Sequence, residues 1–399
     1  MSQVLKWNMF IFAGVQIWVL FLQQISASIA AVGGIQSIVR ILHRDETFAI
    51  KRIVVAGGAF FIIRIIGVFY SPDFDLAIQH SQYPLLGFLF FFFIDMRDKY
   101  GNQVLKRFEQ IWLITAIAAA AVGIIKYSMN IESRIGPPFG ATVPSGSVSG
   151  QPPLGSCTLF AEFLTMTILY FSIPVIRKLN YRKQLYRIIG IVLLGGALLL
   201  TFSRSSWLAT GAVISSLTLW LNRKLFIILL VLGLLSLLIV PYARERVLQS
   251  VNSKDWSTGR VQLWSYAFDK MENHLLMGYG LGSFKTVLTE KERNSLPDTG
   301  VGNWHNQYIQ IVMESGIIGL VSFLWLIFEL YLGMIYGLIN ITDQYVRGKL
   351  IGGIAVLSSV LILSMFETFL SSPVGNVTFF CLMGISVGWM TKDKFSIDG

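Results

Sequence analysis

The sequence predicts an all-helical protein that crosses a membrane many times. Of its 399 residues, 54% are hydrophobic and only 14% are charged, and the mean hydropathy is +0.63. Soluble domains carry about 25% charged residues, so this chain lacks the polar side chains to cover a water-facing globule of its size. Long apolar stretches recur along the chain. The composition excludes a disordered protein, a collagen-like fibre and a disulfide-rich secreted scaffold.

Twelve apolar stretches are candidates for membrane-spanning helices, each of which needs about 20 mostly apolar residues. They cover residues 7–23, 26–41, 52–70, 82–96, 108–126, 154–175, 186–202, 205–221, 224–241, 317–339, 348–366 and 373–391. The first two stretches are short and contain glutamine, so they form either two full spans or a partial hairpin. We therefore expect about twelve transmembrane helices.

The charged loops predict the orientation of these spans. If the N-terminus is cytoplasmic, one set of alternate loops holds 20 of the 32 basic residues, whereas the loops on the other side are balanced in charge. Cytoplasmic loops of membrane proteins carry such an excess of Lys and Arg. We therefore expect both termini on the cytoplasmic side, and we interpret the net charge of +10 as a topology signal rather than a nucleic-acid-binding surface.

Two segments on the predicted outer side are not apolar. Residues 127–153 form a Pro/Gly/Ser-rich loop, which is either a plain connector or an ordered lid. Residues 242–316 form one large outer loop. That loop divides the chain into a part with spans one to nine, residues 1–241, and a part with spans ten to twelve and a short cytoplasmic tail, residues 317–399.

The large outer loop contains a predicted amphipathic helix. Its apolar residues recur at helical spacing, at Val261, Trp264, Phe268, Met271 and Leu275. Ser257 or Thr258 is the expected N-cap of this helix. The glycine-rich residues 278–282 that follow lack the spacing of a dinucleotide-binding motif and predict a tight turn.

The strongest candidate for chemistry closes this loop. His305 precedes the tenth span, and we expect it to share a helical face with Tyr308 at the outer mouth of that span. An imidazole near neutral pH accepts protons from hydroxyl groups, as a general base does. The alternative is an interfacial histidine that only hydrogen-bonds a loop carbonyl. Glu314, further along the same span, is a candidate for orienting His305 or its neighbours.

Two arginines on the same predicted side strengthen this interpretation. Arg204 lies at the outer turn between spans seven and eight, and Arg260 lies in the first turn of the amphipathic helix. Guanidinium groups and helix N-termini both favour phosphate oxygens. With His305, they suit a site that holds a diphosphate leaving group and deprotonates a hydroxyl. Arg64 and Arg134 are weaker candidates, and snorkelling to the membrane surface is the alternative for such arginines.

A metal site has little support in the sequence. Asp73 and Asp75 form a DxD pair in the outer loop after the third span, and such carboxylates can bind Mg²⁺ or Mn²⁺. The pair is short and common, however, and a plain acidic loop is the better interpretation. Cys157 and Cys381 lie in apolar stretches, where packing is more common than a disulfide. We expect no metal and no cofactor.

The residues around His305 resemble a known family motif. His305-Asn306, then nine residues, then Gly316-Ile-Ile-Gly319 is similar to the H[NSQ]X9GXXG motif of the O-antigen ligase family, which O-antigen and exopolysaccharide polymerases share. Residues 203–207 resemble the outer-face arginine element of that family. Thr258-Gly259-Arg260 and the later Gly278-Tyr279-Gly280 resemble its periplasmic-loop pattern.

The resemblance implies a multi-pass glycosyltransferase of the GT-C type in the bacterial inner membrane, with its active site on the periplasmic face. The implied donor is a glycan on undecaprenyl pyrophosphate. The acceptor is lipid A–core oligosaccharide for a ligase, or another lipid-linked glycan for a polymerase. The implied reaction is inverting and metal-independent, and the partners are these lipids and the membrane, not nucleic acid.

The resemblance also implies roles for particular residues. His305 would activate the acceptor hydroxyl, while Arg204 and Arg260 would bind the pyrophosphate. Weaker candidates for substrate contacts are Arg64, Arg134, Asn306, Tyr308 and Glu314. A transporter of lipid-linked sugars is the alternative from a different class. It predicts internal repeats and broken helices, and the sequence shows no convincing repeat.

Overall fold

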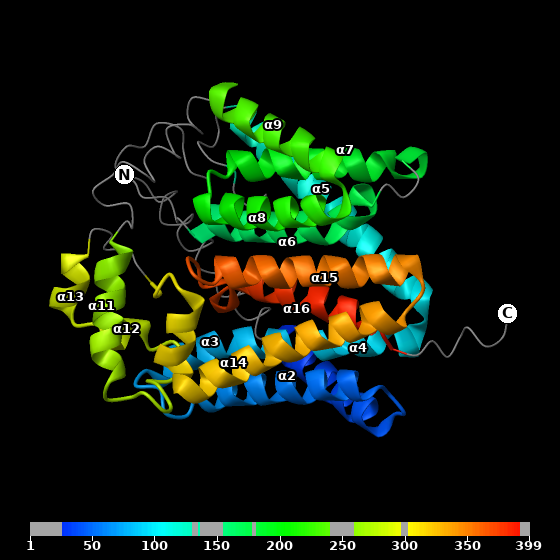
Figure 1. Cartoon of the computed structure of the whole chain (residues 1–399). Helices are drawn as coiled ribbons and strands as arrows, with labels where there is room; N and C mark the ends of the chain where they lie inside the picture. The colour runs from blue at the N-terminus through cyan, green and yellow to red at the C-terminus, as the bar shows by residue number, and fades with distance from the viewer. Residues whose placement is uncertain are drawn as a thin grey trace, which may run out of the picture.

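A computed structural model describes residues 26–129, 135, 155–177, 181–239, 259–296 and 302–391. Within these ranges the chain forms helices joined by turns and contains no β-strand. The long helices run roughly parallel or antiparallel to one another in one bundle (Figure 1), and three shorter helices, α11 to α13, lie against one end of it. We call this end the α11 end and the other the opposite end.

The helices follow one another along the chain with short connections. A helix over residues 26–43 comes first. The labelled elements are α2 (Phe48–Ile66), α3 (Phe74–Gly87), α4 (Leu89–Tyr100), α5 (Asn102–Ser128), α6 (Gly155–Ile176), α7 (Tyr181–Leu200), α8 (Arg204–Leu221), α9 (Arg223–Ile239), α11 (Arg260–Met271), α12 (Phe284–Val287), α13 (Glu290–Ser295), α14 (Gln307–Asn340), α15 (Gln344–Leu363), η1 (Phe369–Ser371) and α16 (Pro373–Gly388).

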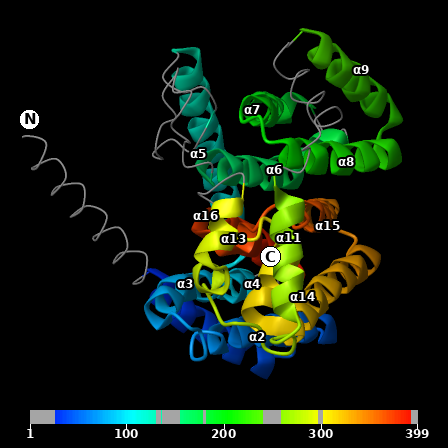
Figure 2. The same ribbon diagram turned by 90° about the vertical axis from the view of Figure 1, so that its left-hand side faces the viewer.

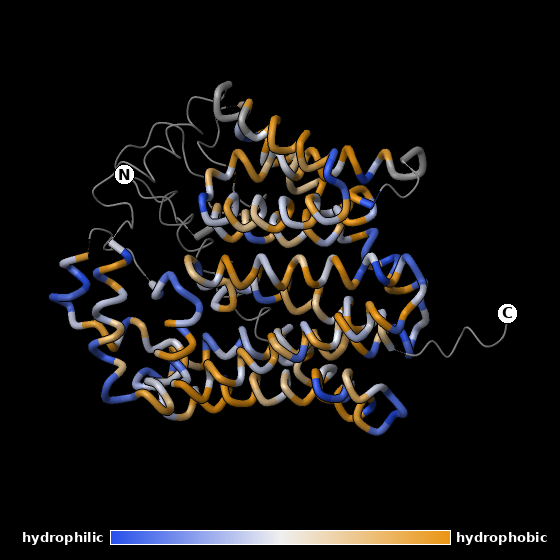
Figure 3. Tube along the Cα trace, in the orientation of Figure 1, coloured by the Kyte–Doolittle hydropathy of each residue, from blue (hydrophilic) through white to orange (hydrophobic). Residues whose placement is uncertain are grey.

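The helices have the length and composition of membrane spans. Five helical segments of the described chain meet both criteria: Phe74–Tyr100, Asn102–Ser128, Cys157–Ile176, Gln307–Asn340 and Gln344–Leu363. Hydrophobic residues run along the helices, and hydrophilic residues gather at the two ends of the bundle (Figure 3). The chain is thus an all-helical, multi-pass membrane protein. The count of about twelve spans stays a prediction, and the first predicted span, 7–23, lies outside the described residues.

The fourth predicted span, 82–96, is part of a longer segment that begins at Phe74. Asp73 is the N-cap of α3, because its side chain accepts a hydrogen bond from the backbone N–H of Leu76 at 2.9 Å. α3 and α4 then meet at Phe88. The aspartate of the DxD pair therefore has a structural role as a helix cap.

α14 begins at Gln307, well before the predicted start of the tenth span at residue 317, and Gly316 interrupts it. Gly316 has φ +63°, and a Cβ atom there would lie 2.0 Å from the carbonyl oxygen of Leu276. Only glycine adopts this left-handed conformation without strain and permits so close an approach. The family-like glycine at this position thus marks a break in the helix.

The glycine-rich segment 275–282 lies along this break and uses its free backbone groups. Tyr279 donates its N–H to the carbonyl of Met313 at 2.7 Å, and Ile317 donates to the carbonyl of Leu275 at 2.8 Å. These bonds satisfy polar groups that a helix break would leave unpaired in a membrane, where such groups cost several kcal/mol. The segment fixes α11 and its neighbours to the bundle.

The bundle has one main apolar core, and the α11 end has a small core of its own. Seen end-on in Figure 2, α11 and α13 lie across the bundle near α14. Leu263 and Ala267 of α11 are buried with Phe284, Trp304 and other residues of this small core. The predicted apolar face of the amphipathic helix is partly wrong, because its members Val261 and Phe268 are 55% and 59% exposed. The small core is filled by the neighbouring face of the helix.

The predicted N-cap of this helix is also wrong. α11 begins at Arg260, and its N-cap is Gly259, which has a left-handed conformation and no side chain to cap with. Ser257 and Thr258 lie outside the described residues, as does nearly all of the Pro/Gly/Ser-rich loop. The first helical residue of α11 is therefore the arginine that the sequence singled out.

Candidate active site

The N-terminal ends of three helices meet at the turn that follows α15. α8 begins at Arg204, α11 begins at Arg260, and α14 has Asn306 as its N-cap. A helix N-terminus presents unpaired N–H groups and about half a positive charge, which makes it a natural site for an anion. The turn itself carries Glu367, which contacts all three helix ends or their flanking residues.

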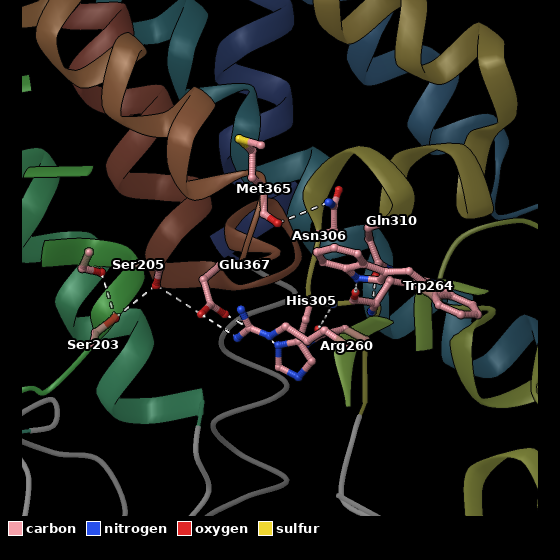
Figure 4. A network of polar contacts seen from close by, with 12 residues as sticks. Ser203, Ser205, Arg260, Trp264, His305, Asn306, Gln310, Met365 and Glu367 are labelled. Atoms are coloured by element: carbon pink, nitrogen blue, oxygen red, sulfur yellow. Dashed lines mark hydrogen bonds and ion pairs between the residues drawn. The ribbon is translucent and has the colours of Figure 1, made fainter. Parts of the chain in front are cut away.

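Glu367 is the centre of this cluster (Figure 4). Its Oε1 atom accepts hydrogen bonds from a guanidinium NH₂ of Arg260 and from the hydroxyl of Ser205, both at 3.3 Å. Its Oε2 atom lies 3.7 Å from Nδ1 of His305, which is an ion-pair distance and too long for a hydrogen bond. We call Arg260, His305, Glu367 and Ser205 the Glu367 cluster. It joins residues from four separate parts of the chain.

The Glu367 carboxyl is held in its ionised form. Burial raises the pKa of this carboxyl, but His305 and Arg260 beside it outweigh burial and leave the pKa below its ordinary value. A carboxylate that faces Nδ1 favours the imidazole tautomer with its hydrogen on Nδ1. The other ring nitrogen, Nε2, points away from Glu367 (Figure 4) and is then free to accept a proton.

His305 does not lie on the helix, contrary to the prediction that it shares a helical face with Tyr308. It precedes the N-cap of α14 and has a left-handed backbone conformation, with φ +46°. This conformation costs roughly 1–2 kcal/mol for a residue with a side chain. The side chain of Asn303 accepts the backbone N–H of His305 at 2.9 Å and supports the turn. Strain of this kind is frequent in functional sites.

The residue before His305 anchors the turn in the small core. Trp304 is fully buried, and its ring packs edge-on against Phe284 with 4.9 Å between the ring centroids. Its carbonyl accepts the indole N–H of Trp264 from α11 at 2.9 Å. Because α11 also carries Arg260, this contact fixes the arginine and the histidine relative to each other.

The three residues after His305 bind the end of α15 and its following turn. The Asn306 side chain donates to the carbonyl of Met365 at 3.3 Å, and the Gln307 backbone N–H donates to the carbonyl of Ser364 at 2.8 Å. The hydroxyl of Tyr308 donates to the carbonyl of Leu361 at 3.0 Å. Asn306 and Tyr308, predicted as weak substrate contacts, thus hold the turn that carries Glu367 in place.

Arg64 and Glu314 form a separate buried ion pair, with 2.6 Å between the guanidinium NH₂ and the carboxylate. Their side chains are only 3% and 1% exposed, so Arg64 does not snorkel to the surface. Glu314 does not contact His305. It accepts the Gln310 amide at 2.7 Å, and Gln310 in turn accepts the Trp304 backbone N–H at 3.2 Å. Glu314 therefore acts on the neighbour of His305 through Gln310.

The remaining predicted residues are placed as follows. Arg204 is the first residue of α8, directly before Ser205 of the Glu367 cluster. Arg134 lies outside the described residues. The part of the chain that the structure describes holds no group of three or more His, Cys, Asp or Glu arranged for a metal ion. Arg204, Arg260 and His305 come together, whereas Arg64 and Glu314 pair elsewhere.

Glu367 and Ser205 are the residues that sequence reasoning missed. Glu367 follows an apolar stretch and has no motif around it. One signal was present: it is an acid at the outer end of the eleventh predicted span, on the same predicted side as His305. A carboxylate on that side is a candidate partner for a histidine, but its proximity is visible only in three dimensions.

Fold and site together define a multi-pass membrane protein with a cationic, histidine-containing site where helix ends meet. Residues 189–324 match the family model described as O-Antigen ligase, and this region includes Arg204, Arg260 and His305 but not Glu367. The chain therefore contains an O-antigen ligase family region, and the resemblance that the motif at His305 predicted is confirmed.

Two curated relatives were found. An uncharacterized protein of Haemophilus influenzae is 22% identical over 84% of this chain and 84% of its own length. A Rickettsia conorii protein whose name contains the words polysaccharide ligase is 29% identical over 42% of this chain and 44% of its own length. The ligase name thus comes from a relative that matches less than half of either chain.

Proposed function

We propose that this protein transfers a glycan from undecaprenyl pyrophosphate to a hydroxyl of lipid A–core oligosaccharide at the periplasmic face of the inner membrane. The observation that carries the proposal is the meeting of three helix N-termini, with Arg204, Arg260 and His305, around the ionised Glu367. The family match and the name of the Rickettsia relative support a ligase-like activity.

The positive groups of the site suit the donor pyrophosphate. Arg260 uses one guanidinium nitrogen on Glu367, and a guanidinium carries five N–H donors in total, so others are left for phosphate oxygens. Arg204 begins a neighbouring helix, and the helix N-termini add partial positive charge. These groups stabilise the negative charge that develops on pyrophosphate as it leaves.

His305 and Glu367 supply the base. In the proposed step, Nε2 of His305 takes the proton of the acceptor hydroxyl, and the acceptor oxygen attacks the anomeric carbon of the glycan. The bond from that carbon to the pyrophosphate oxygen breaks, and its electron pair leaves with undecaprenyl pyrophosphate. Attack opposite to the leaving group inverts the anomeric carbon. Glu367 stabilises the imidazolium that forms, as the carboxylate does in a hydrolase triad.

The alternative of a lipid-linked sugar transporter predicted broken helices near the membrane midplane. α14 does have a break at Gly316, but the groups that it frees bond the backbone of residues 275–280 instead of lining an open path. The polar residues of the Glu367 cluster also gather at the α11 end. A transferase accounts for both features.

The direct test is glycan transfer by the purified full-length protein. The protein receives an undecaprenyl-pyrophosphate glycan with lipid A–core, or with no second class of acceptor, each with and without EDTA. We expect glycan on lipid A–core and no loss in EDTA. Lengthening of the glycan on its lipid carrier would instead assign a polymerase. No transfer in either arm would contradict an enzyme, and loss in EDTA would return Asp73 and Asp75 as metal ligands.

A further inference from the structure

A groove at the opposite end of the bundle takes no part in the proposed transfer. It has a volume of about 450 Å³ and lies between α5, α6, α7 and α15, near the starts of α5, α7 and α15. Lys106, Arg187 and Lys349 are its basic lining residues, and Glu109 is its acid. Pockets that hold small molecules or their head groups have volumes of about 300–1,000 Å³, so the groove has room for a ligand.

The single acid of the groove is fully engaged inside the protein. Glu109 is 3% exposed and pairs with Lys349 at 2.5 Å. The hydroxyls of Tyr170 and Tyr345 and the indole N–H of Trp389 also donate to it, each at 3.0 Å. Its charge is therefore neutralised by Lys349 and shielded by three further donors, and it does not neutralise the other two cations.

Lys106 and Arg187 are the cations that remain. Both are partly exposed, one on α5 and one on α7. Lys106 lies over the ring of Tyr345, with 5.4 Å from Nζ to the ring centroid, and Arg187 hydrogen-bonds the Tyr186 hydroxyl through Nε at 2.9 Å. These contacts hold two positive charges at the groove and leave several of their N–H groups for an anion.

The other half of the groove is apolar and continues along α5. Leu113, Ile114 and Ile117 line it, and Ile114 is 63% exposed on the face of a membrane-spanning helix. From Lys106 to Ile117 the helix rises about 16 Å, roughly half of the hydrocarbon thickness of a bilayer. A ligand that fills the groove thus has a negatively charged group at one end and a hydrocarbon chain that runs toward the middle of the membrane.

We propose that this groove binds an anionic phospholipid, with its phosphate between Lys106 and Arg187 and an acyl chain along α5. Basic pockets between transmembrane helices bind the head groups of such lipids on the cytoplasmic side. The loops at this end carry the excess of Lys and Arg that predicts the cytoplasmic side. The apolar half of the groove distinguishes a lipid from free phosphate, which has no use for it.

The test is lipid binding by the purified full-length protein, followed by native mass spectrometry with phosphatidylglycerol and with phosphatidylcholine. We expect the double variant Lys106→Gln/Arg187→Gln to bind phosphatidylglycerol about 10- to 30-fold more weakly, because each cation near an anionic lipid contributes roughly 1 kcal/mol. Phosphatidylcholine binding is expected to change by less than about threefold. The single variant Lys106→Gln is expected to show a smaller loss, and it keeps the test decisive if the double variant does not fold.

A matched control separates the groove from general surface charge. Lys99 and Arg107 are exposed basic residues at the same end that do not line the groove. The double variant Lys99→Gln/Arg107→Gln removes the same charge and is expected to keep phosphatidylglycerol binding. An equal loss in this control, or no loss in the groove variant, would overturn the proposal. Displacement of the lipid by soluble glycerol phosphate would assign the groove to free phosphate.

Discussion

The α11 end contains two arginine–carboxylate clusters that differ in burial. Arg64 and Glu314 are 3% and 1% exposed and lie 2.6 Å apart. Arg260 and Glu367 are 23% and 11% exposed and lie 3.3 Å apart, with His305 at 29% beside them. The buried pair has its charges fully used inside the protein, whereas the Glu367 cluster keeps N–H groups and a ring nitrogen within reach of a substrate.

The difference shows that residue type alone does not mark a functional arginine. A buried ion pair is costly to form and very costly to break, because removal of one partner leaves an uncompensated charge. A partly exposed pair contributes little to stability. We therefore expect variants of the first pair to affect folding and variants of the Glu367 cluster to affect chemistry.

The largest effect is expected from His305→Gln. Loss of a general base typically slows a reaction about 10²- to 10⁴-fold, so the initial rate of glycan transfer should fall by that factor while the melting temperature stays unchanged. His274→Gln is the matched control, because His274 is an exposed histidine near the same end. Wild-type transfer by His305→Gln would remove the base from the mechanism.

The next effect is expected from Arg64→Met. The variant leaves Glu314 buried without its cation, which should lower the free energy of unfolding by about 3–5 kcal/mol. The double variant Arg64→Met/Glu314→Leu removes both charges and should recover most of this loss. Denaturant unfolding of the purified protein measures both. If Arg260→Met costs as much stability as Arg64→Met, the contrast between the two clusters is wrong.

A smaller effect is expected from Gly316→Ala, which tests how far the buried pair depends on the helix break. The added Cβ would meet the Leu276 carbonyl in a left-handed conformation, so we expect a loss of about 1–3 kcal/mol. Gly58→Ala in α2 is the control, because its Cβ meets nothing within 4 Å. The same unfolding measurement applies, and equal stability of the two variants would contradict the role of the break.

The smallest effect is expected from Glu367→Gln on stability, about 1 kcal/mol at neutral pH. Because the pKa of Glu367 is lower in the folded protein, its contribution is present above the ordinary carboxyl range and is lost as the pH falls through the folded value. The difference in melting temperature between wild type and variant should therefore be constant from about pH 8 to about pH 6 and vanish in strong acid. A difference that vanishes already near neutral pH would place the folded pKa higher.

The sequence alone determined the class of protein and three of the site residues. The excess of apolar residues requires membrane-spanning helices, because a bilayer leaves no other use for stretches of this length. The motif at His305 and the arginines at Arg204 and Arg260 pointed to one chemistry. The structure brings all three to the Glu367 turn.

Only the tertiary structure decided which charges meet. Glu367 reaches His305 because Asn306, Gln307 and Tyr308 bind the end of α15, and no local pattern encodes that contact. The left-handed conformation of His305 likewise depends on the buried Trp304 and on Asn303. Periodicity specifies which segments are helical, but burial and long-range hydrogen bonds determine whether an arginine is a fixed part of the core or a group that can bind a substrate.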